Sequence, residues 1–395
     1  PDELEWSRVC ADEESNQVAA MTWALESAQP ELAVDIGASL TPFWMTAGRV
    51  ATEDRFLGPL LEEARSNPSP ELVVLLAHAA YTAMGPTALT LADEGLAVAH
   101  GLGDEFAIGL ALARMGSIVG WTGDFAEGVA LTRRALTHLD RVDHPKAMDC
   151  LFNVAGMLVR VEDEKGRRLD ETEAAVAELL VRAESLPSVR HQGLAHLLFG
   201  WVDWERGDLD PAREHLLTAV GLHSEIGDER WVAWEMHSLV NIELAAGNTD
   251  RAVAYHERYG ATFREIWGGL FLPMDGLVQL AVGDVRSGVA TLVEALDKYS
   301  GAETEIVSAL TALASACTDL EASLAGRLFG AAHGLRTRKK LALAAHEVRT
   351  TEDASARLRR ALGEERFQLE FATGETMTID EVAAYARDAL QDFAP

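Results

Sequence analysis

The sequence predicts an all-α protein made of helical hairpins that stack into a right-handed superhelix. Three observations predict it: amphipathic stripes with a helical period, Gly-containing turns at regular spacing, and a composition rich in Ala and Leu. Apolar residues make up 48% of the chain, enough for a large core, whereas only 7% of residues are aromatic. Because strands are enriched in aromatic and β-branched residues, this balance favours helix-on-helix packing over a sheet.

The clearest hairpin lies in residues 193–220, GLAHLLFGWVDWERGDLDPAREHLLTAV. Apolar residues recur at steps of three and four in its first half, which places them on one stripe of a helix. A Gly-Asp pair at 207–208 predicts the turn, and Asp210 followed by Pro211 predicts the cap and first residue of a second helix. One hairpin cannot bury both stripes, so it is expected to stack on copies of itself.

The small residues of this hairpin stand at fixed distances from its turn. Gly200 and Ala212 are expected to let the two helices approach closely, and Ala219 to let the next hairpin pack. The same arrangement recurs, with turns predicted near residues 48, 85, 123, 163, 207, 247, 283 and 319, which are 36 to 44 residues apart. This spacing predicts about eight helical pairs of the tetratricopeptide-like type.

The predicted organisation has three parts. Residues 1–30 form an N-terminal helix, spanning 3–28, that leads into the solenoid. Residues 31–320 form the tetratricopeptide-like superhelix, and residues 321–395 form a helical C-terminal cap that covers the last exposed stripe.

Local sequence signals predict departures from the regular pattern. The charged run at 163–169 is expected to form a longer loop or an extended helix end. Gly268-Gly269 and Pro273 predict a short or bent helix before the turn at 283. In the cap, Thr378 is expected to cap the last helix, and three glycines at steps of four predict a tight helix–helix contact: Gly326, Gly330 and Gly334.

Charge and cysteine content exclude several classes of function. The formal net charge of −29 argues against direct nucleic-acid binding, because phosphate neutralisation needs a basic surface. Three scattered cysteines suggest neither a disulfide framework nor a zinc site, and they favour a reducing, cytoplasmic location. No apolar run is long enough for a membrane span. The chain begins at PDELEW inside a helical pattern, so it is expected to be a fragment of a longer polypeptide.

Motifs for catalysis and for metal or cofactor binding are not found. The sequence contains no H-E-x-x-H, G-x-S-x-G, S-x-x-K or G-x-x-x-x-G-K-[ST] motif and no clustered Cys and His spacing. His191 and His196 are five residues apart, which does not bring them together on one helix face. We therefore predict a non-enzymatic protein with no catalytic residues, no metal site and no cofactor.

The candidate binding site is a groove on the concave face, where the first helix of each pair is expected to lie. Its predicted residues come from several positions of three consecutive first helices that are expected to point into the groove: Asn153, Arg160, Trp201, Trp204, Glu205, Trp234, His237 and Asn241. Indole walls with a few polar groups suit a small molecule or a peptide. The alternative is that Trp201 and Trp204 only fill space between hairpins, since they share a stripe with Leu194.

Several stretches resemble one family of bacterial regulators. They are ADEESNQVAAMTWALES at 11–27, PFWMTAGRVATEDRFLGPLLEEA at 42–64, the Gly-Asp turns, AGRLFGAAHGLRTR at 325–338, and LRRALGEERFQLEFATGETMTIDEVAAYA at 358–386. In this order they resemble the tetratricopeptide-like arm of STAND-type signal-transduction ATPases, the MalT-like, AfsR-like and LuxR-type transcriptional regulators of actinobacteria. The resemblance extends over nearly the whole chain.

The resemblance implies a sensing arm that binds an effector or a protein and controls an ATPase. It also implies ATPase and DNA-binding modules elsewhere in a parent polypeptide, because this chain has no phosphate loop. The predicted function is therefore a non-catalytic sensing and protein-interaction arm with an effector or partner in its groove. The alternative is a freestanding adaptor that binds a peptide or protein.

Overall fold

A computed structural model describes most of the chain. It describes residues 3–27, 29–47, 50–83, 86–122, 124–163, 166–267, 272–298, 303–339, 341 and 345–390. Within these ranges the chain is almost entirely helical, and the only strands form a short antiparallel hairpin. The predicted all-α class is confirmed.

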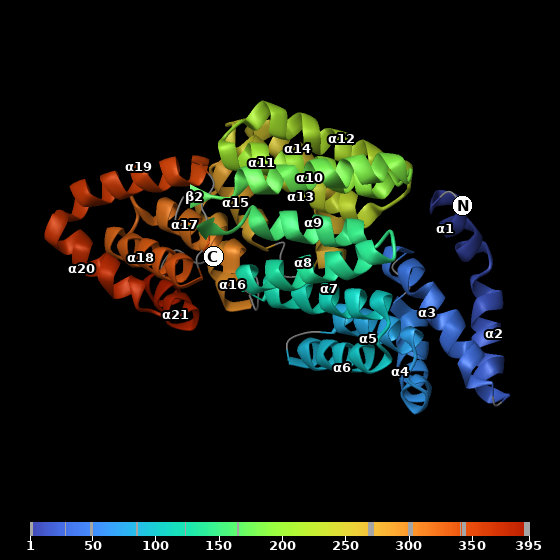
Figure 1. Ribbon diagram of the computed structural model, residues 1–395. Helices are drawn as coiled ribbons and strands as arrows, with labels where there is room; N and C mark the ends of the chain where they lie inside the picture. The colour runs from blue at the N-terminus through green and yellow to red at the C-terminus, as the bar shows by residue number, and fades with distance from the viewer. Residues whose placement is uncertain are drawn as a thin grey trace. The chain divides into compact units, whose positions relative to one another are not determined.

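The elements follow one another as in Figure 1. They are α1 (Glu3–Asp12), α2 (Glu14–Glu26), α3 (Pro30–Ala47), α4 (Val50–Ser66), α5 (Pro70–Thr82), α6 (Pro86–Leu102), α7 (Glu105–Trp121), α8 (Phe125–Arg141), α9 (Ala147–Leu158), β1 (Glu162–Asp163), β2 (Gly166–Arg167), α10 (Leu169–Ser185), α11 (Val189–Arg206), α12 (Leu209–Glu225), α13 (Glu229–Ala245), α14 (Thr249–Trp267), α15 (Leu272–Ala281), α16 (Val285–Lys298), α17 (Glu303–Cys317), α18 (Ala322–Lys339), α19 (Ala345–Leu362), α20 (Glu364–Glu375) and α21 (Ile379–Ala389).

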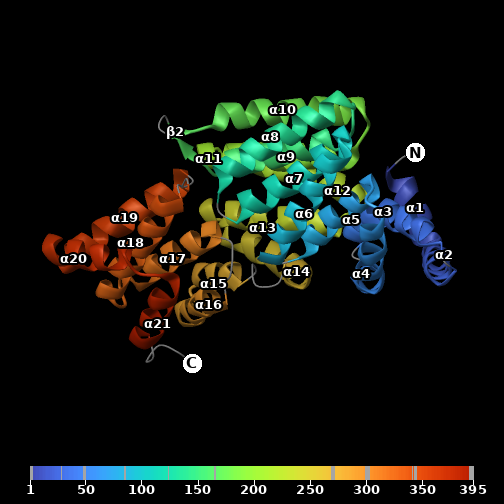
Figure 2. The same ribbon diagram turned by 60° about the horizontal axis from the view of Figure 1, so that its bottom comes forward.

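The chain forms two compact units. The first consists of Pro1–Leu158, Asp170–Ala195 and Leu222–Asp228, and the second of Val159–Leu169, His196–Gly221 and Glu229–Pro395. In chain order, α3 to α18 fall into eight consecutive pairs, and neighbours such as α15 and α16 of the second unit pack directly against each other (Figure 2).

The turns within three pairs of the second unit share one geometry. At the α11–α12 turn, the amide of Gly207 donates to the carbonyl of Trp204 at 3.0 Å, and that of Asp208 donates to Asp203 at 2.9 Å. Gly207 has a φ of 88°, a conformation that a residue with a side chain rarely adopts. Gly247 and Gly283 have φ values of 74° and 87° at the two following turns. The turns predicted at 207, 247 and 283 from the sequence spacing are therefore confirmed by the positive φ of their glycines.

Close approach of the paired helices is also repeated. A Cβ added at Gly200 would lie 3.2 Å from the carbonyl oxygen of Ala212, and one added at Gly276 would lie 3.1 Å from that of Gly288. Both glycines precede the turn of their hairpin by seven residues. A side chain at either position would force the helices apart. The two glycines therefore allow the close approach of paired helices that the sequence predicts.

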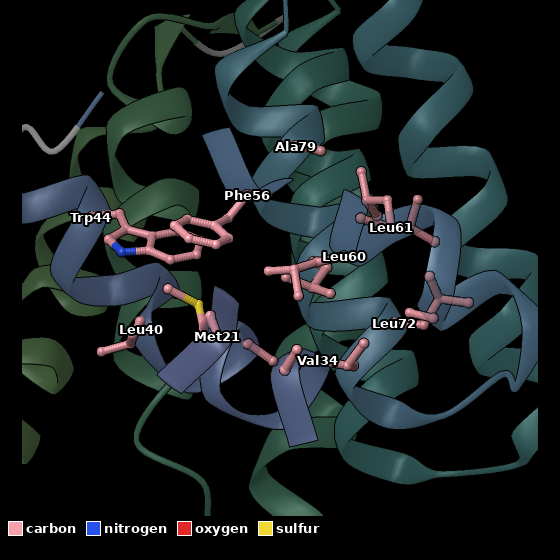
Figure 3. Close-up of a cluster of buried hydrophobic side chains, with 14 of the residues drawn as sticks. Met21, Val34, Leu40, Trp44, Phe56, Leu60, Leu61, Leu72 and Ala79 are labelled. Atoms are coloured by element: carbon pink, nitrogen blue, oxygen red, sulfur yellow. The ribbon is translucent and has the colours of Figure 1, made fainter. Parts of the chain in front are cut away.

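The core of the first unit begins in its N-terminal helices. Met21 of α2 packs with residues of α3, α4 and α5, including Trp44, Phe56 and Leu60, in one buried cluster (Figure 3). Trp44 and Phe56 are each 2% exposed. These helices bury their stripes against each other, as expected of stacked hairpins.

The structure differs from the sequence predictions at several points. The helix expected over 3–28 is divided into α1 and α2. The cap predicted at Asp210 is wrong, because α12 already begins at Leu209 and the Asp210 carboxylate instead accepts from Arg213 at 2.5 Å. Of the two alternatives given for the run at 163–169, the longer loop is the one observed in its described part, because Asp163, Gly166 and Arg167 belong to the β1–β2 hairpin and α10 begins only at Leu169. The turn positions Gly48, Gly85 and Gly123, and also Gly268-Gly269, lie outside the described residues.

The C-terminal helices confirm the predicted glycine contact. Added Cβ atoms at Gly330 and Gly334 of α18 would overlap the carbonyl oxygens of Phe371 and Glu375 on α20, which runs directly beside α18. The predicted cap at Thr378 is also confirmed, since its hydroxyl accepts from the amide of Glu381 at 3.3 Å in a reciprocal capping box.

Candidate functional site

A cavity of about 620 Å³ lies in the second unit. Its wall comes from the first helices of four consecutive pairs, α11, α13, α15 and α17, together with Val159 and Arg160 from the turn after α9. The second helices contribute only Leu216 of α12 and Val285 of α16. The volume falls in the range of sites that hold drug-sized ligands.

Each helix gives the cavity a different surface. From α11 and α13 come indoles and polar groups, whereas α15 contributes apolar side chains such as Met274, Leu277 and Leu280. The residues from α17 are small or carry hydroxyls: Ser308, Thr311, Ala312, Ser315 and Ala316. The cavity therefore has an aromatic and polar side, an aliphatic side and a small hydroxyl-bearing side.

Aromatic rings form a continuous row along the α11 and α13 side. The guanidinium carbon of Arg160 lies 5.1 Å from the ring centroid of Trp201, a cation–π distance. Ring centroids of Trp201 and Trp234 are 6.5 Å apart, and those of Trp234 and His237 are 6.1 Å apart. His237 then stacks on Phe263 of α14 at 4.4 Å. This row fixes the orientation of the side chains that line the cavity.

His237 is neutral in this setting. Burial, with a smaller effect of the nearby His256, lowers the pKa of His237 to about 4. The His256 ring itself pairs with Asp275, with 2.9 Å between Nε2 and Oδ1. At neutral pH the cavity wall therefore presents an uncharged imidazole at this point.

A buried carboxylate holds the α13 wall in place. Glu243 is 0% exposed and accepts from Arg213 Nε of α12 at 2.6 Å and from the Asn248 amide at 2.8 Å. Arg251 of α14 lies 3.5 Å away. A buried charge is tolerated only when its partners satisfy it, so these contacts tie α12, α13 and α14 together next to the lining residues Asn241 and Ile242.

Seven of the eight residues predicted for the groove line this cavity: Arg160, Trp201, Trp204, Glu205, Trp234, His237 and Asn241. Asn153 does not belong to the lining; it lies on α9, in the first unit. The predicted set of lining residues is also incomplete. It ends at α13, whereas α15 and α17 also line the cavity. Leu277 follows Gly276 as Trp201 follows Gly200, so the same offset identifies Leu277 from sequence. The prediction that these residues bind a ligand stays a prediction.

Groups with catalytic potential are held in structural environments. The three cysteines are free and buried, and burial raises the pKa of Cys10, of Cys150 and, to about 12, of Cys317. Such thiols are poor nucleophiles. Among the described residues, no group of three or more His, Cys, Asp or Glu side chains is placed to hold a metal ion. Nor does any described helix have the length and apolar character needed to cross a membrane.

Comparisons with known proteins identify a fold. No family model matches the chain, and no curated protein sequence matches it significantly. Among solved structures, the chain is similar to a Rap protein complexed with Competence and Sporulation Factor, with 15% identity, a TM-score of 0.56, and coverage of 90% of this chain and 99% of that chain. The apo form of RapI gives 12% identity, a TM-score of 0.40, and coverage of 88% and 98%. The first match supports the predicted tetratricopeptide-like helical repeat.

Proposed function

We propose that this chain is a non-catalytic binding module that takes up a peptide or small-molecule effector in the cavity lined by α11, α13, α15 and α17. The observation that supports this most strongly is the cavity itself. Its volume, its three indoles and its few polar groups are typical of ligand sites. The first helices of a stacked array present such a surface, because their second helices pack behind them.

The structural match supports binding as the activity. The Rap protein of similar fold was solved complexed with Competence and Sporulation Factor, so a scaffold of this kind is able to hold a factor. This is an argument by fold analogy. The cavity supports this analogy, because it offers a concave surface on which a ligand could bind.

Two settings are compatible with this activity. An adaptor that binds a peptide or protein is the better supported one, since the Rap structure of similar fold was solved complexed with a factor. A sensing arm of a STAND-type ATPase rests on the sequence resemblance alone, including the stretch at 325–338. A nucleotide-binding module encoded upstream in the same reading frame would favour the sensing arm.

A cavity-filling variant tests the proposal. Ala312 of α17 is partly exposed and lines the cavity, so Ala312→Trp places an indole in the space that a ligand would take. We expect the neutral dye Nile red to gain fluorescence with the wild-type protein and to lose most of that gain with Ala312→Trp. Peptides and metabolites that raise the melting temperature of the wild type should fail to do so for this variant.

The matched control is Ala261→Trp, which adds the same ring at an exposed position on α14 of the same unit. Circular dichroism and melting temperature show whether both variants keep the fold. Equal dye and ligand binding by the wild type, Ala312→Trp and Ala261→Trp would refute the cavity as the site.

A further inference from the structure

We propose that the occupant of the cavity is a cation that donates hydrogen bonds, a guanidinium or ammonium group attached to an aliphatic body. This inference rests on the proposed function and adds the charge class of the ligand. Four features of the second unit support it: hydroxyls whose protons are engaged within their own helices, indoles and a carboxylate in the same lining, a guanidinium already stacked on one indole, and an aliphatic wall.

Three of the four hydroxyls that line the cavity donate their protons to carbonyl oxygens of their own helices. Thr311 donates to the carbonyl of Val307 at 2.8 Å, and Ser315 donates to that of Thr311 at 2.9 Å. Ser238 donates to the carbonyl of Trp234 at 3.1 Å. A hydroxyl has one proton and two acceptor lone pairs, so Thr311 and Ser315 offer acceptors to a ligand, and Ser238, which also accepts from the Trp201 indole at 3.5 Å, has one lone pair left. A ligand that donates hydrogen bonds is the complement.

The carboxylate and the indole rings of the lining also favour a cationic ligand. Glu205 lies on α11 directly after Trp204, and both line the cavity with Trp201 and Trp234. Indole is the aromatic ring that attracts cations most strongly, and a carboxylate close by strengthens the attraction. The neutral His237 adds no repelling charge.

Arg160 shows that the site accepts such a group. Its guanidinium lies over Trp201 at 5.1 Å, in the position that a ligand's cation would occupy. We infer that Arg160 acts as an internal placeholder, which the ligand replaces. An anion-binding role for Arg160 predicts the opposite response to its removal, so a substitution distinguishes the two.

The remaining surface suits the body of the ligand. Met274, Leu277 and Leu280 of α15 form an aliphatic wall, continued by Leu244 of α13 and Val285 of α16. Burial of an alkyl chain there is favourable in proportion to its area. The formal net charge of −29 further raises the local concentration of cations around the protein.

The first test compares ligands that differ only in their head group. Binding of octylguanidinium, 1-octanol and octanoate to the wild-type chain is measured by isothermal titration calorimetry at neutral pH. We expect the guanidinium to bind about tenfold or more tightly than the alcohol, and octanoate to bind most weakly. A parallel pair, acetyl-Arg-Leu-Leu-amide and its citrulline analogue, tests whether a peptide supplies the same cation.

The second test uses two variants with matched controls. Glu205→Gln should weaken octylguanidinium binding several-fold and leave 1-octanol unchanged, whereas Glu214→Gln, at an exposed carboxylate on α12, should change neither. Arg160→Gln should strengthen octylguanidinium binding. Its control, Arg258→Gln, removes a guanidinium that also lies 5.1 Å from an aromatic centroid, that of Tyr259, but on α14 outside the cavity.

The outcomes separate the two proposals. Equal binding of the alcohol and the guanidinium, tighter binding of octanoate, or weaker guanidinium binding by Arg160→Gln would overturn the preference for cations while the cavity remains a ligand site. Failure of all the compounds, the alcohol included, would overturn the proposed function as well.

Discussion

His237 lies between the cavity of the second unit and the interior of the α13–α14 hairpin. It lines the cavity, stacks on Phe263 at 4.4 Å, and also borders a small void shared with Tyr255 and Tyr259. An imidazole in this place contributes to stability only while it is neutral, because protonation would bury a charge. The residue therefore links acidity to the integrity of the cavity wall.

This link predicts a pH dependence. The pKa of His237 falls from 6.5 to about 4 on folding, so between these values the unfolded chain binds more protons. The free energy of unfolding should accordingly fall as the pH falls from 6.5 to 4, by up to about 3 kcal/mol from this group, and show no effect of it above pH 6.5. Urea titrations across this range measure it.

Substitutions isolate the contribution of this ring. His237→Phe keeps an aromatic side chain against Phe263 and removes the titrating group, so it should lose less stability on acidification than the wild type. His100→Phe, at an exposed histidine of α6, should follow the wild type. Parallel pH profiles for the wild type and His237→Phe would contradict the account.

Single positions of the site differ in how well the sequence predicts them. The three indoles and Arg160 are recognisable because the hairpin turns predicted at 163, 207 and 247 place them, at several different distances before the turn, on the expected groove side of their hairpins. Thr311 and Ser315 have no such signal, since a hydroxyl on a helix is equally common at a solvated position. Asn153 lies on the same predicted side of its hairpin. It is included wrongly in the lining because helix periodicity carries no information on which hairpins contribute to one cavity.

At the scale of helices, the α18–α20 contact depends on glycine. Backbone carbonyls of α20 lie where a Cβ at Gly330 or Gly334 would be, and a Cβ at Gly374 of α20 would overlap the carbonyl of Arg327. Arg327 also pairs with Glu370 of α20 at 2.5 Å and stacks over Tyr385 of α21 at 4.3 Å. The C-terminal helices are thus joined by close backbone packing and by one well-placed arginine.

Substitution of one glycine tests this packing. Gly330→Ala must push α20 away from α18, so we expect the free energy of unfolding to fall by about 1–3 kcal/mol. Gly221→Ala on α12 meets no atom within 4 Å and should stabilise the protein by up to about 1 kcal/mol, as Ala does in an exposed helix. Chemical denaturation measures both, and a neutral Gly330→Ala would refute the tight contact.

The sequence predicts whole elements better than their ends. Gly207, Gly247 and Gly283 mark turns because few other residues adopt their positive φ. The predicted start of α12 is wrong by two residues, since Asp208 and Asp210 are equally good capping residues and Pro211 fits several positions of a first turn. The β1–β2 hairpin has two residues per strand, too few for any alternation of polar and apolar residues to appear.

For the whole molecule, the repeat spacing and amphipathic stripes predict the helical-repeat fold that the comparison with the Rap structure supports. The division into two compact units has no counterpart in the sequence, because the hairpin signals continue across its boundaries. The strongly acidic composition favours cationic ligands at long range, yet the cavity chemistry follows only from which hydroxyl protons and indole faces the fold brings together.

The most direct test of the central claim, that this cavity holds a ligand, is fluorine NMR of protein labelled with 5-fluorotryptophan. The nine tryptophans give separate resonances, assigned by single Trp→Phe substitutions. Titration with 1-octanol and octylguanidinium should shift the resonances of Trp201, Trp204 and Trp234 and leave those of Trp6, Trp23 and Trp44 unchanged. Shifts confined to Trp6, Trp23 and Trp44, or no shift at any indole, would contradict the account.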